Sequence, residues 1–206
     1  MANGETNSNL GNPWLVLGTV MVGTLLIGLD RTVVNLAVPS IISDFGISVS
    51  TAAWVATGYI ISNAVFVPVF GKLGDLYGNR VIYLWSFVGF IILSVLAGFA
   101  WNFTSLVAFR VLQGLVGAAV YPTAMSLIVK SFADRKARAQ ALGIWSSSFA
   151  VSAVIGPLLG GYLVDNRSWR WVFFINLPIG IAGRILTLRL IRQDRPADSG
   201  AFDWPG

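Results

Sequence analysis

The chain has 206 residues and a formal net charge of +5, and its composition is 55% hydrophobic but only 11% charged. Soluble domains carry roughly a quarter charged residues, so this composition excludes an ordinary soluble domain and indicates an integral membrane protein. The chain contains no cysteine, no histidine and no paired carboxylates on one predicted helix face, which argues against disulfides, metal sites and a membrane enzyme.

Six apolar stretches are long enough to cross a membrane as helices. A hydrocarbon core of ~30 Å needs about 20 apolar residues in a helix, whereas transmembrane strands alternate every second residue over about 10 residues. The predicted spans are 14–38, 51–70, 81–100, 103–129, 139–164 and 171–190. The sequence therefore predicts an all-α integral membrane fold, a six-transmembrane-helix bundle over 14–190. It is flanked by an N-terminal tail (1–13) and a connector (191–206).

The basic residues of the connections gather on one side of the predicted bundle. They are Lys72, Arg80, Lys130, Arg135, Lys136, Arg138, Arg189, Arg192 and Arg195, against Arg167 and Arg170 on the other side. Basic connections remain in the cytoplasm, so we predict a multi-pass protein of the cell membrane with both termini cytoplasmic. This orientation explains the basic residues without a nucleic-acid partner.

Glycosylation patterns at Asn102 and Asn166 fall on the outer side and matter only in an organism with a secretory pathway.

Charged residues within the spans need an explanation, because a charge in hydrocarbon costs free energy. At 1.5 Å per residue, Asp30 lies about 24 Å along the first span, and Arg110 about 10 Å below the outer end of the fourth. Both lie in one layer, where they could pair or share a wet cavity if the two helices are neighbours. Arg31 is explained by snorkelling to the outer interface. An alternative interpretation of Asp30 is that it is only the local counter-charge of Arg31, although adjacent side chains of a helix point about 100° apart and do not face each other. Arg184 is explained by snorkelling to the cytoplasmic interface.

Polar and small residues mark one face of the fourth span and one of the fifth. Gln113 lies one turn below Arg110 on the same face. Gly156 and Gly160 are four residues apart, which lets two helix backbones approach closely. Pro157 removes a backbone hydrogen bond and predicts a bend. Tight packing is one interpretation of this segment, and a helix shaped to move against its neighbours is the other.

The connection between the second and third predicted spans reads GKLGDLYGNR, 71–80. It is too short to form a domain. Gly71 and Gly78 allow a tight backbone, while Asp75 and Arg80 provide opposite charges for an ionic latch at the cytoplasmic ends of the two helices. A solvated loop that only sets orientation is the alternative interpretation.

Together these motifs resemble those of the major facilitator superfamily, and more narrowly its drug/proton antiporters with fourteen helices. The matching segments are LDRTVVNLAVP (29–39), GKLGDLYGNR (71–80), RVLQGLVGAAVYP (110–122), GPLLGG (156–161) preceded by Gly143, SWRWVFFINLPIG (168–180) and PADSGAFDWPG (196–206). Three positions depart from the family pattern. Leu76 and Asn79 replace basic residues that are common in the hallmark loop, and Ser152 replaces a glycine.

The resemblance implies a proton-coupled exporter of small, mostly apolar compounds such as drugs, which uses the proton gradient and no cofactor. It implies proton coupling through Asp30, Arg110 and Gln113. It also implies an exporter motif of Gly143, Gly156, Pro157, Gly160 and Gly161 in the fifth helix. The family binds substrate between two six-helix halves near the midplane, so we expect this apparently truncated chain to be the N-terminal half, with a C-terminal half as partner. The alternative is a transport-inactive fragment or a half-transporter that needs such a partner.

Overall fold

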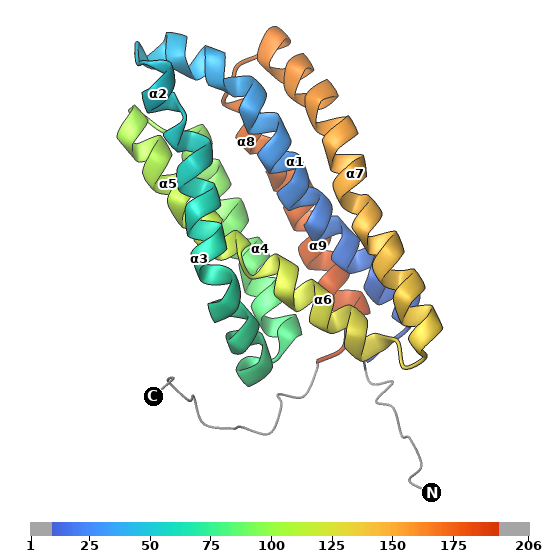
Figure 1. The fold of residues 1–206 in the computed structure, drawn as a ribbon. Coiled ribbons are helices and arrows are strands. Elements are labelled where there is room, and N and C mark those ends of the chain that lie inside the picture. Colours follow the sequence, from blue (N-terminus) through green and yellow to red (C-terminus); the bar gives the residue numbers. More distant parts are fainter. Residues whose placement is uncertain (1–9, 194–206) are drawn as a thin grey trace, which may run out of the picture.

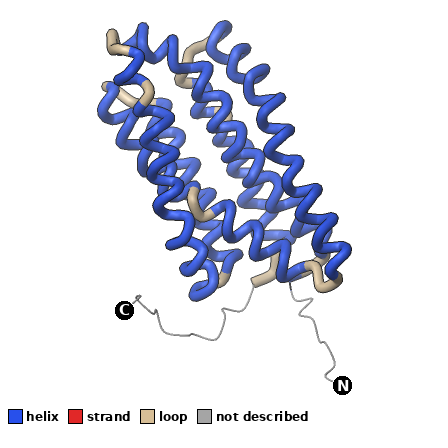
Figure 2. The backbone as a smooth tube through the Cα atoms, in the orientation of Figure 1, coloured by secondary structure: helices blue, strands red, loops and turns tan. Residues whose placement is uncertain are grey.

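The computed structural model describes residues 10–193, and this part of the chain is an α-helical bundle without strands (Figures 1 and 2). Its helices are α1 (Pro13–Phe45), α2 (Val49–Ala52), α3 (Trp54–Tyr77), α4 (Asn79–Gly98), α5 (Phe103–Gly117), α6 (Val120–Ser131), α7 (Arg135–Asn166), α8 (Trp171–Phe174) and α9 (Asn176–Leu190). They make six segments that are long and apolar enough to cross a membrane. The predicted all-α, six-span fold class is therefore confirmed. Predictions for residues 1–9 and 194–206, which include Arg195 and PADSGAFDWPG, lie outside the described residues.

The two ends of the described chain meet at one end of the bundle. The backbone N–H of Arg192 donates to the carbonyl of Leu10 at 3.0 Å. Nearby, the ring of Trp14 packs edge-on against Phe132, with 5.1 Å between centroids. We call this the terminal end of the bundle, and the end at which Phe45 packs against Trp169 the far end.

The first span is longer than the predicted 14–38, because Pro39 does not end it. Helix α1 begins after Asn12, whose side chain accepts from the N–H of Trp14, and it continues past Pro39 to Phe45. It stops at Gly46, whose φ of 62° is the left-handed conformation that glycine adopts most readily at a helix end. The longer helix places Asp30 near the middle of the span, roughly 25 Å from its start and 22 Å from its end.

The predicted connection at 71–80 is mostly helical. Helix α3 continues to Tyr77 and α4 begins at Asn79, so only Gly78 separates them. Gly78 has a φ of 94°, and its N–H donates to the carbonyl of Gly74 at 3.0 Å. One glycine therefore makes the reversal between two spans, since its missing Cβ permits this backbone conformation.

The fourth and sixth spans are each interrupted, and a proline explains both breaks. A proline has no N–H to donate to the carbonyl four residues earlier, and its ring clashes with that turn. Pro122 stands four residues after Ala118, where α5 gives way to α6, and Pro178 stands four residues after Phe174, where α8 gives way to α9. The predicted span 103–129 corresponds to one membrane-crossing segment, Phe103–Ser131, whose helix is broken at 118–119.

Helix α7 packs along α1 through small residues (Figure 1). A Cβ added at Gly28 would lie 2.7 Å from the Cβ of Ser152, and one added at Gly160 would lie 3.2 Å from the Cα of Val33. Gly156 lies against the side chain of Thr32 in the same way. The helices are therefore tightly packed at this motif. Helix α7 stays one continuous helix through Pro157, which is exposed.

The buried apolar residues form two clusters, one toward each end of the bundle. Helix α1 contributes Val16 to Ile27 to the cluster at the terminal end, and Val33 to Ile41 to the cluster at the far end. Asp30 lies on α1 between the two clusters. The bundle therefore has a polar layer between two apolar cores.

Candidate functional site

The polar layer is built around an ion pair between α1 and α5. The Nη1 of Arg110 donates to the Oδ2 of Asp30 at 2.7 Å, and the two side chains are 1% and 0% exposed. Depth along the helices predicted that these two charges would share a layer, and the structure places them in direct contact. Removing one partner of a buried ion pair typically costs about 3–5 kcal/mol, so the two charges depend on each other.

Two amide side chains complete the environment of Asp30. The same Nη1 of Arg110 donates to the Oε1 of Gln113 at 2.7 Å, and the Nε2 of Gln113 lies 3.4 Å from the Oδ1 of Asp30. From α9, the Nδ2 of Asn176 donates to that Oδ1 at 2.8 Å and contacts the hydroxyl of Ser94 on α4 at 2.9 Å. The carboxylate of α1 thus receives donors from two helices, α5 and α9, and Asn176 extends the network to α4.

The guanidinium of Arg110 is fixed by more than Asp30. Its Nε donates to the backbone carbonyl of Val55 at 3.2 Å. It also lies over the ring of Tyr59, 4.3 Å from the centroid, and 5.8 Å from that of Phe173. Stacking on an aromatic face stabilises a cation by roughly 0.5–2 kcal/mol. These contacts partly replace the water that a buried guanidinium has lost.

Arg31 turns to a neighbouring helix and not to the far end of the bundle, so the snorkelling explanation for it is wrong. Its Nη2 donates to the Oδ1 of Asn63 on α3 at 2.7 Å, and its guanidinium lies 5.5 Å from the ring centroid of Tyr59. Arg31 is exposed and takes no part in the ion pair of Asp30 with Arg110. The far end of α1 is roughly 20 Å away, which is beyond the reach of an arginine side chain.

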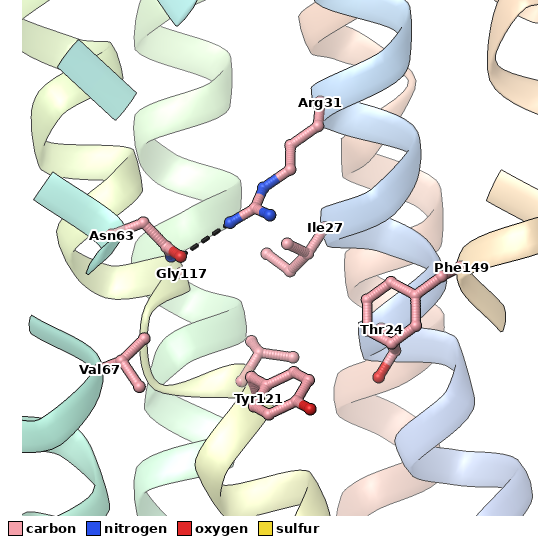
Figure 3. A pocket seen from close by; sticks show the side chains of 9 residues that line it. Thr24, Ile27, Arg31, Asn63, Val67, Gly117, Tyr121 and Phe149 are labelled. Carbon is pink, nitrogen blue, oxygen red and sulfur yellow. Dashed lines mark hydrogen bonds between the residues drawn. The ribbon is translucent and has the colours of Figure 1, made fainter. Parts of the chain in front are cut away.

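Arg31 instead lines a cavity of about 190 Å³ between α1, α3, α6 and α7, with Gly117 at the end of α5 also in the lining. Figure 3 shows Arg31 extending from α1 toward Asn63, with the rings of Tyr121 and Phe149 farther down the cavity. The lining residues are Thr24, Ile27, Arg31, Asn63, Val67, Gly117, Val120, Tyr121 and Phe149. The charged side chain and the amide of the lining lie at the end that holds Arg31 and Asn63, and the rest is mostly apolar, with the hydroxyl-bearing Thr24 and Tyr121 as exceptions.

The other predicted site residues lie apart from this layer. Gly71, Asp75, Gly78 and Arg80 lie at the terminal ends of α3 and α4, where Asp75 is exposed and Arg80 donates to the carbonyl of Leu188 at 3.2 Å. No ion pair joins Asp75 to Arg80 within residues 10–193. On α7, Gly156 and Gly160 face α1, whereas Gly143 and Gly161 have open space where a Cβ would be.

Asn176, Ser94 and Asn63 were missed as site residues. Asn176 belongs to a segment, SWRWVFFINLPIG, that was singled out only by resemblance, and Asn63 is a polar residue within an apolar span. A buried asparagine in a predicted span is a usable signal, because polar groups in lipid need partners. Among residues 10–193, no group of three potential metal-binding His, Cys, Asp or Glu side chains occurs.

The sequence profile of the Major Facilitator Superfamily matches residues 20–205. The chain belongs to this superfamily. This match confirms the resemblance that the motifs indicated. Members of the superfamily are membrane transporters rather than enzymes.

Curated relatives carry export functions in their names. The chain is 38% identical over 180 residues to the multidrug export protein EmrB of Escherichia coli strain K12, covering 86% of this chain and 35% of that protein. It is also 38% identical over 185 residues to the tetracenomycin C resistance and export protein of Streptomyces glaucescens, covering 90% and 34%. The chain thus spans about a third of the length of these relatives.

A solved structure shares the fold. A bacterial homologue of the human lysosomal transporter Spinster, in an inward-facing and unoccupied conformation, superposes with a TM-score of 0.71 at 23% identity. The match covers 93% of this chain and 46% of the other chain. The six-span bundle is therefore the arrangement found in about half of that transporter.

Proposed function

We propose that this chain forms the N-terminal half of a proton-coupled exporter of small, mostly apolar compounds. The observation that carries the proposal is the buried carboxylate of Asp30, paired with Arg110 and held by two amides near the middle of a membrane span. Ionisable groups at this depth are costly and mark proton or substrate paths in membrane proteins. The exporters among the relatives support the direction of transport.

Proton exchange at Asp30 would change the contacts of the polar layer. In the pair, the Nη1 of Arg110 donates to the Oδ2 of Asp30. A proton on Asp30 removes one charge of the pair and leaves Arg110 with Gln113 and a backbone carbonyl. Since losing a charge partner costs a buried ion several kcal/mol, on the order of 3–5, the proton shifts the balance between packings of α1 and α5.

The amides of Gln113 and Asn176 suit both protonation states of Asp30. Each amide carries a donor nitrogen and an acceptor oxygen. The nitrogen donates to an ionised carboxylate, and rotation by 180° brings the oxygen into position to accept from a protonated one. The Oδ1 of Asn176 is buried and has no hydrogen-bond partner within residues 10–193, so it is available for that second role.

Arg31 supports a partner half that covers the cavity. It is exposed near the middle of α1, where contact with lipid would cost several kcal/mol, about 2.5–3.5 on insertion scales. Protein or water must therefore face it. A second six-helix unit against this face would enclose the cavity and keep water there, as expected for a substrate site between two halves.

The exposed position of Arg31 also favours the second candidate, a half-transporter that is inactive without such a partner.

We also propose that the terminal end of the bundle is cytoplasmic. The basic residues of the connections at that end are Lys72, Arg80, Lys130, Arg135, Lys136, Arg138, Arg189 and Arg192. The bilayer and a small-molecule substrate are then the other partners of the chain.

The first prediction concerns proton-driven efflux from bacteria that lack their main exporters. We expect Asp30→Asn and Arg110→Ala to abolish the efflux that the protein confers, because both remove the ion pair. The measurement is loss of a fluorescent dye after energisation, with protein levels quantified in the membrane. The matched control is Asp165→Asn, which changes an exposed carboxylate on α7 and should leave efflux intact.

The same assay separates the two candidates. The chain alone will give efflux if it functions by itself, whereas a half-transporter will give efflux only when a C-terminal half is co-expressed. Unchanged efflux in both Asp30→Asn and Arg110→Ala would contradict the proposed proton coupling.

A further inference from the structure

We propose that the cavity beside Arg31 binds aromatic compounds with a single negative charge, such as aryl carboxylates and phenolates. The inference rests on the proposed function, because it names the substrate class that this half of the exporter recognises. It depends on three features of the cavity, which are an uncompensated cation, an aromatic surface and the separation of the cation from the aromatic rings.

The cation is Arg31, and it has no carboxylate partner within residues 10–193. Its hydrogen-bond partner is the neutral amide of Asn63, and none of the cavity-lining residues is acidic. The adjacent Asp30 does not line the cavity, and its carboxylate is paired with Arg110. The cavity therefore carries one net positive charge at the end that holds Arg31.

Asn63 on α3 holds the guanidinium of Arg31 in place across the cavity from α1. While its Oδ1 accepts from Arg31, its Nδ2 donates to the carbonyl of Gly114 at 3.1 Å. The amide is thereby fixed between two helices, and Arg31 loses less freedom when a ligand binds. A guanidinium has five N–H donors in a planar fork that matches a carboxylate, and the contact with Asn63 uses only one of its nitrogens.

The opposite end of the cavity offers aromatic rings. Tyr121 and Phe149 line it, with centroids 6.2 Å apart. Trp145 packs against both rings, at 5.0 Å and 6.0 Å, and donates from its Nε1 to the hydroxyl of Thr24 at 2.8 Å. Such rings pack favourably against a planar aromatic ligand, and Ile27 and Val67 complete the apolar surface in Figure 3.

The size and surroundings of the cavity fit a small ligand held by one strong polar contact. Its volume of about 190 Å³ is below the roughly 300–1,000 Å³ of complete ligand sites, as expected if a partner half supplies the rest. In an apolar enclosure a charge-assisted hydrogen bond is strengthened. An arginine at one end and aromatic rings at the other thus select for an anion attached to a ring, over a neutral or cationic compound of the same shape.

The experiment measures binding, so it does not depend on transport. The purified chain is placed in nanodiscs of phosphatidylcholine, and radiolabelled 2-naphthoate is titrated by equilibrium dialysis. Unlabelled 2-naphthalenemethanol and (2-naphthylmethyl)trimethylammonium compete as the neutral and cationic analogues. We expect both analogues to compete about tenfold less well than unlabelled 2-naphthoate.

Variants assign the preference to the cavity. Arg31→Gln should remove the preference for the anion, and Arg31→Lys should keep most of it, because the lysine retains the charge. Arg184→Gln is the matched control, since Arg184 is an exposed arginine within α9 that lies outside this cavity. It should bind 2-naphthoate as the unchanged chain does.

The results distinguish the inference from the proposed function. Equal binding of the three naphthyl compounds, no binding of 2-naphthoate to the folded chain, or a preference that survives Arg31→Gln would overturn the inference. Loss of 2-naphthoate binding on adding phosphatidylglycerol would also overturn it, because the site would then belong to an anionic lipid. Anion-selective binding without any proton-driven efflux, even with a C-terminal half co-expressed, would instead leave the inference standing and contradict the proposed function.

Discussion

Asp30 and Arg31 are neighbours in the sequence and have opposite environments in the bundle. Asp30 is fully buried and paired with Arg110, whereas Arg31 is exposed in a cavity and bound to a neutral amide. The rotation of about 100° between adjacent helical residues is enough to direct them to different faces of α1. The proposed division of labour, proton coupling at one residue and ligand recognition at the next, follows from this rotation.

At the same scale, Asn176 is the residue whose loss should affect the polar layer most without removing a charge. We predict that Asn176→Ala lowers the stability of the folded chain by about 1–3 kcal/mol, because Asp30 and Ser94 each lose a buried hydrogen-bond partner. The measurement is the apparent melting temperature in detergent, followed by circular dichroism. Asn166→Ala, which changes an exposed amide at the end of α7, is the control. Equal melting temperatures for the two variants would contradict the role given to Asn176.

At the scale of elements, the glycines of these helices have very different surroundings. Gly114 on α5 lies against the backbone of α3, since a Cβ there would be 3.1 Å from the Cα of Tyr59. Gly143 on α7 has open space at the same place. The two glycines look alike in the sequence, and only the packing of the helices separates a required glycine from a replaceable one.

This difference gives a prediction with an internal control. We expect Gly114→Ala to destabilise the bundle by about 1–3 kcal/mol, because an added methyl group must push two backbones apart. Gly143→Ala should be neutral or stabilising by up to ~1 kcal/mol, because alanine favours a helix over glycine. Unfolding of both variants in denaturant, compared with the unchanged chain, measures the effect. A larger loss for Gly143→Ala than for Gly114→Ala would contradict the packing.

At the scale of the whole molecule, the spans alternate in direction and place their connections at two opposite ends (Figure 1). Val49 and Tyr77 begin and end the second span and are 72% and 63% exposed. Because the basic connections lie at the end that holds Tyr77, we expect Val49 to face the outside of the cell and Tyr77 the cytoplasm.

The absence of cysteine from the sequence makes this orientation easy to test. We predict that a membrane-impermeant maleimide labels Val49→Cys on intact cells and labels Tyr77→Cys only after the membrane is opened. Labelling of both variants in opened membranes is the control for reactivity. The reverse pattern would overturn the proposed orientation, although it would leave the fold unchanged.

The sequence by itself determined the fold class and most of the polar layer. Apolar runs of about 20 residues leave little choice but membrane-spanning helices, and the helix rise placed Asp30 and Arg110 at comparable depth. Helix ends were less predictable. Pro39 did not end α1, while Pro122 did interrupt the fourth span, because neighbouring helices decide whether a lost hydrogen bond is tolerated.

Only the tertiary structure decided where individual side chains point. Depth along a helix says how far a residue lies from each end, but not which neighbour it faces. Arg31 therefore looked like a residue that snorkels, until α3 supplied Asn63 and α6 and α7 supplied the rest of a cavity. Asn176 lies 146 positions from Asp30, so only the packing of α9 against α1 and α4 brings its amide to the carboxylate.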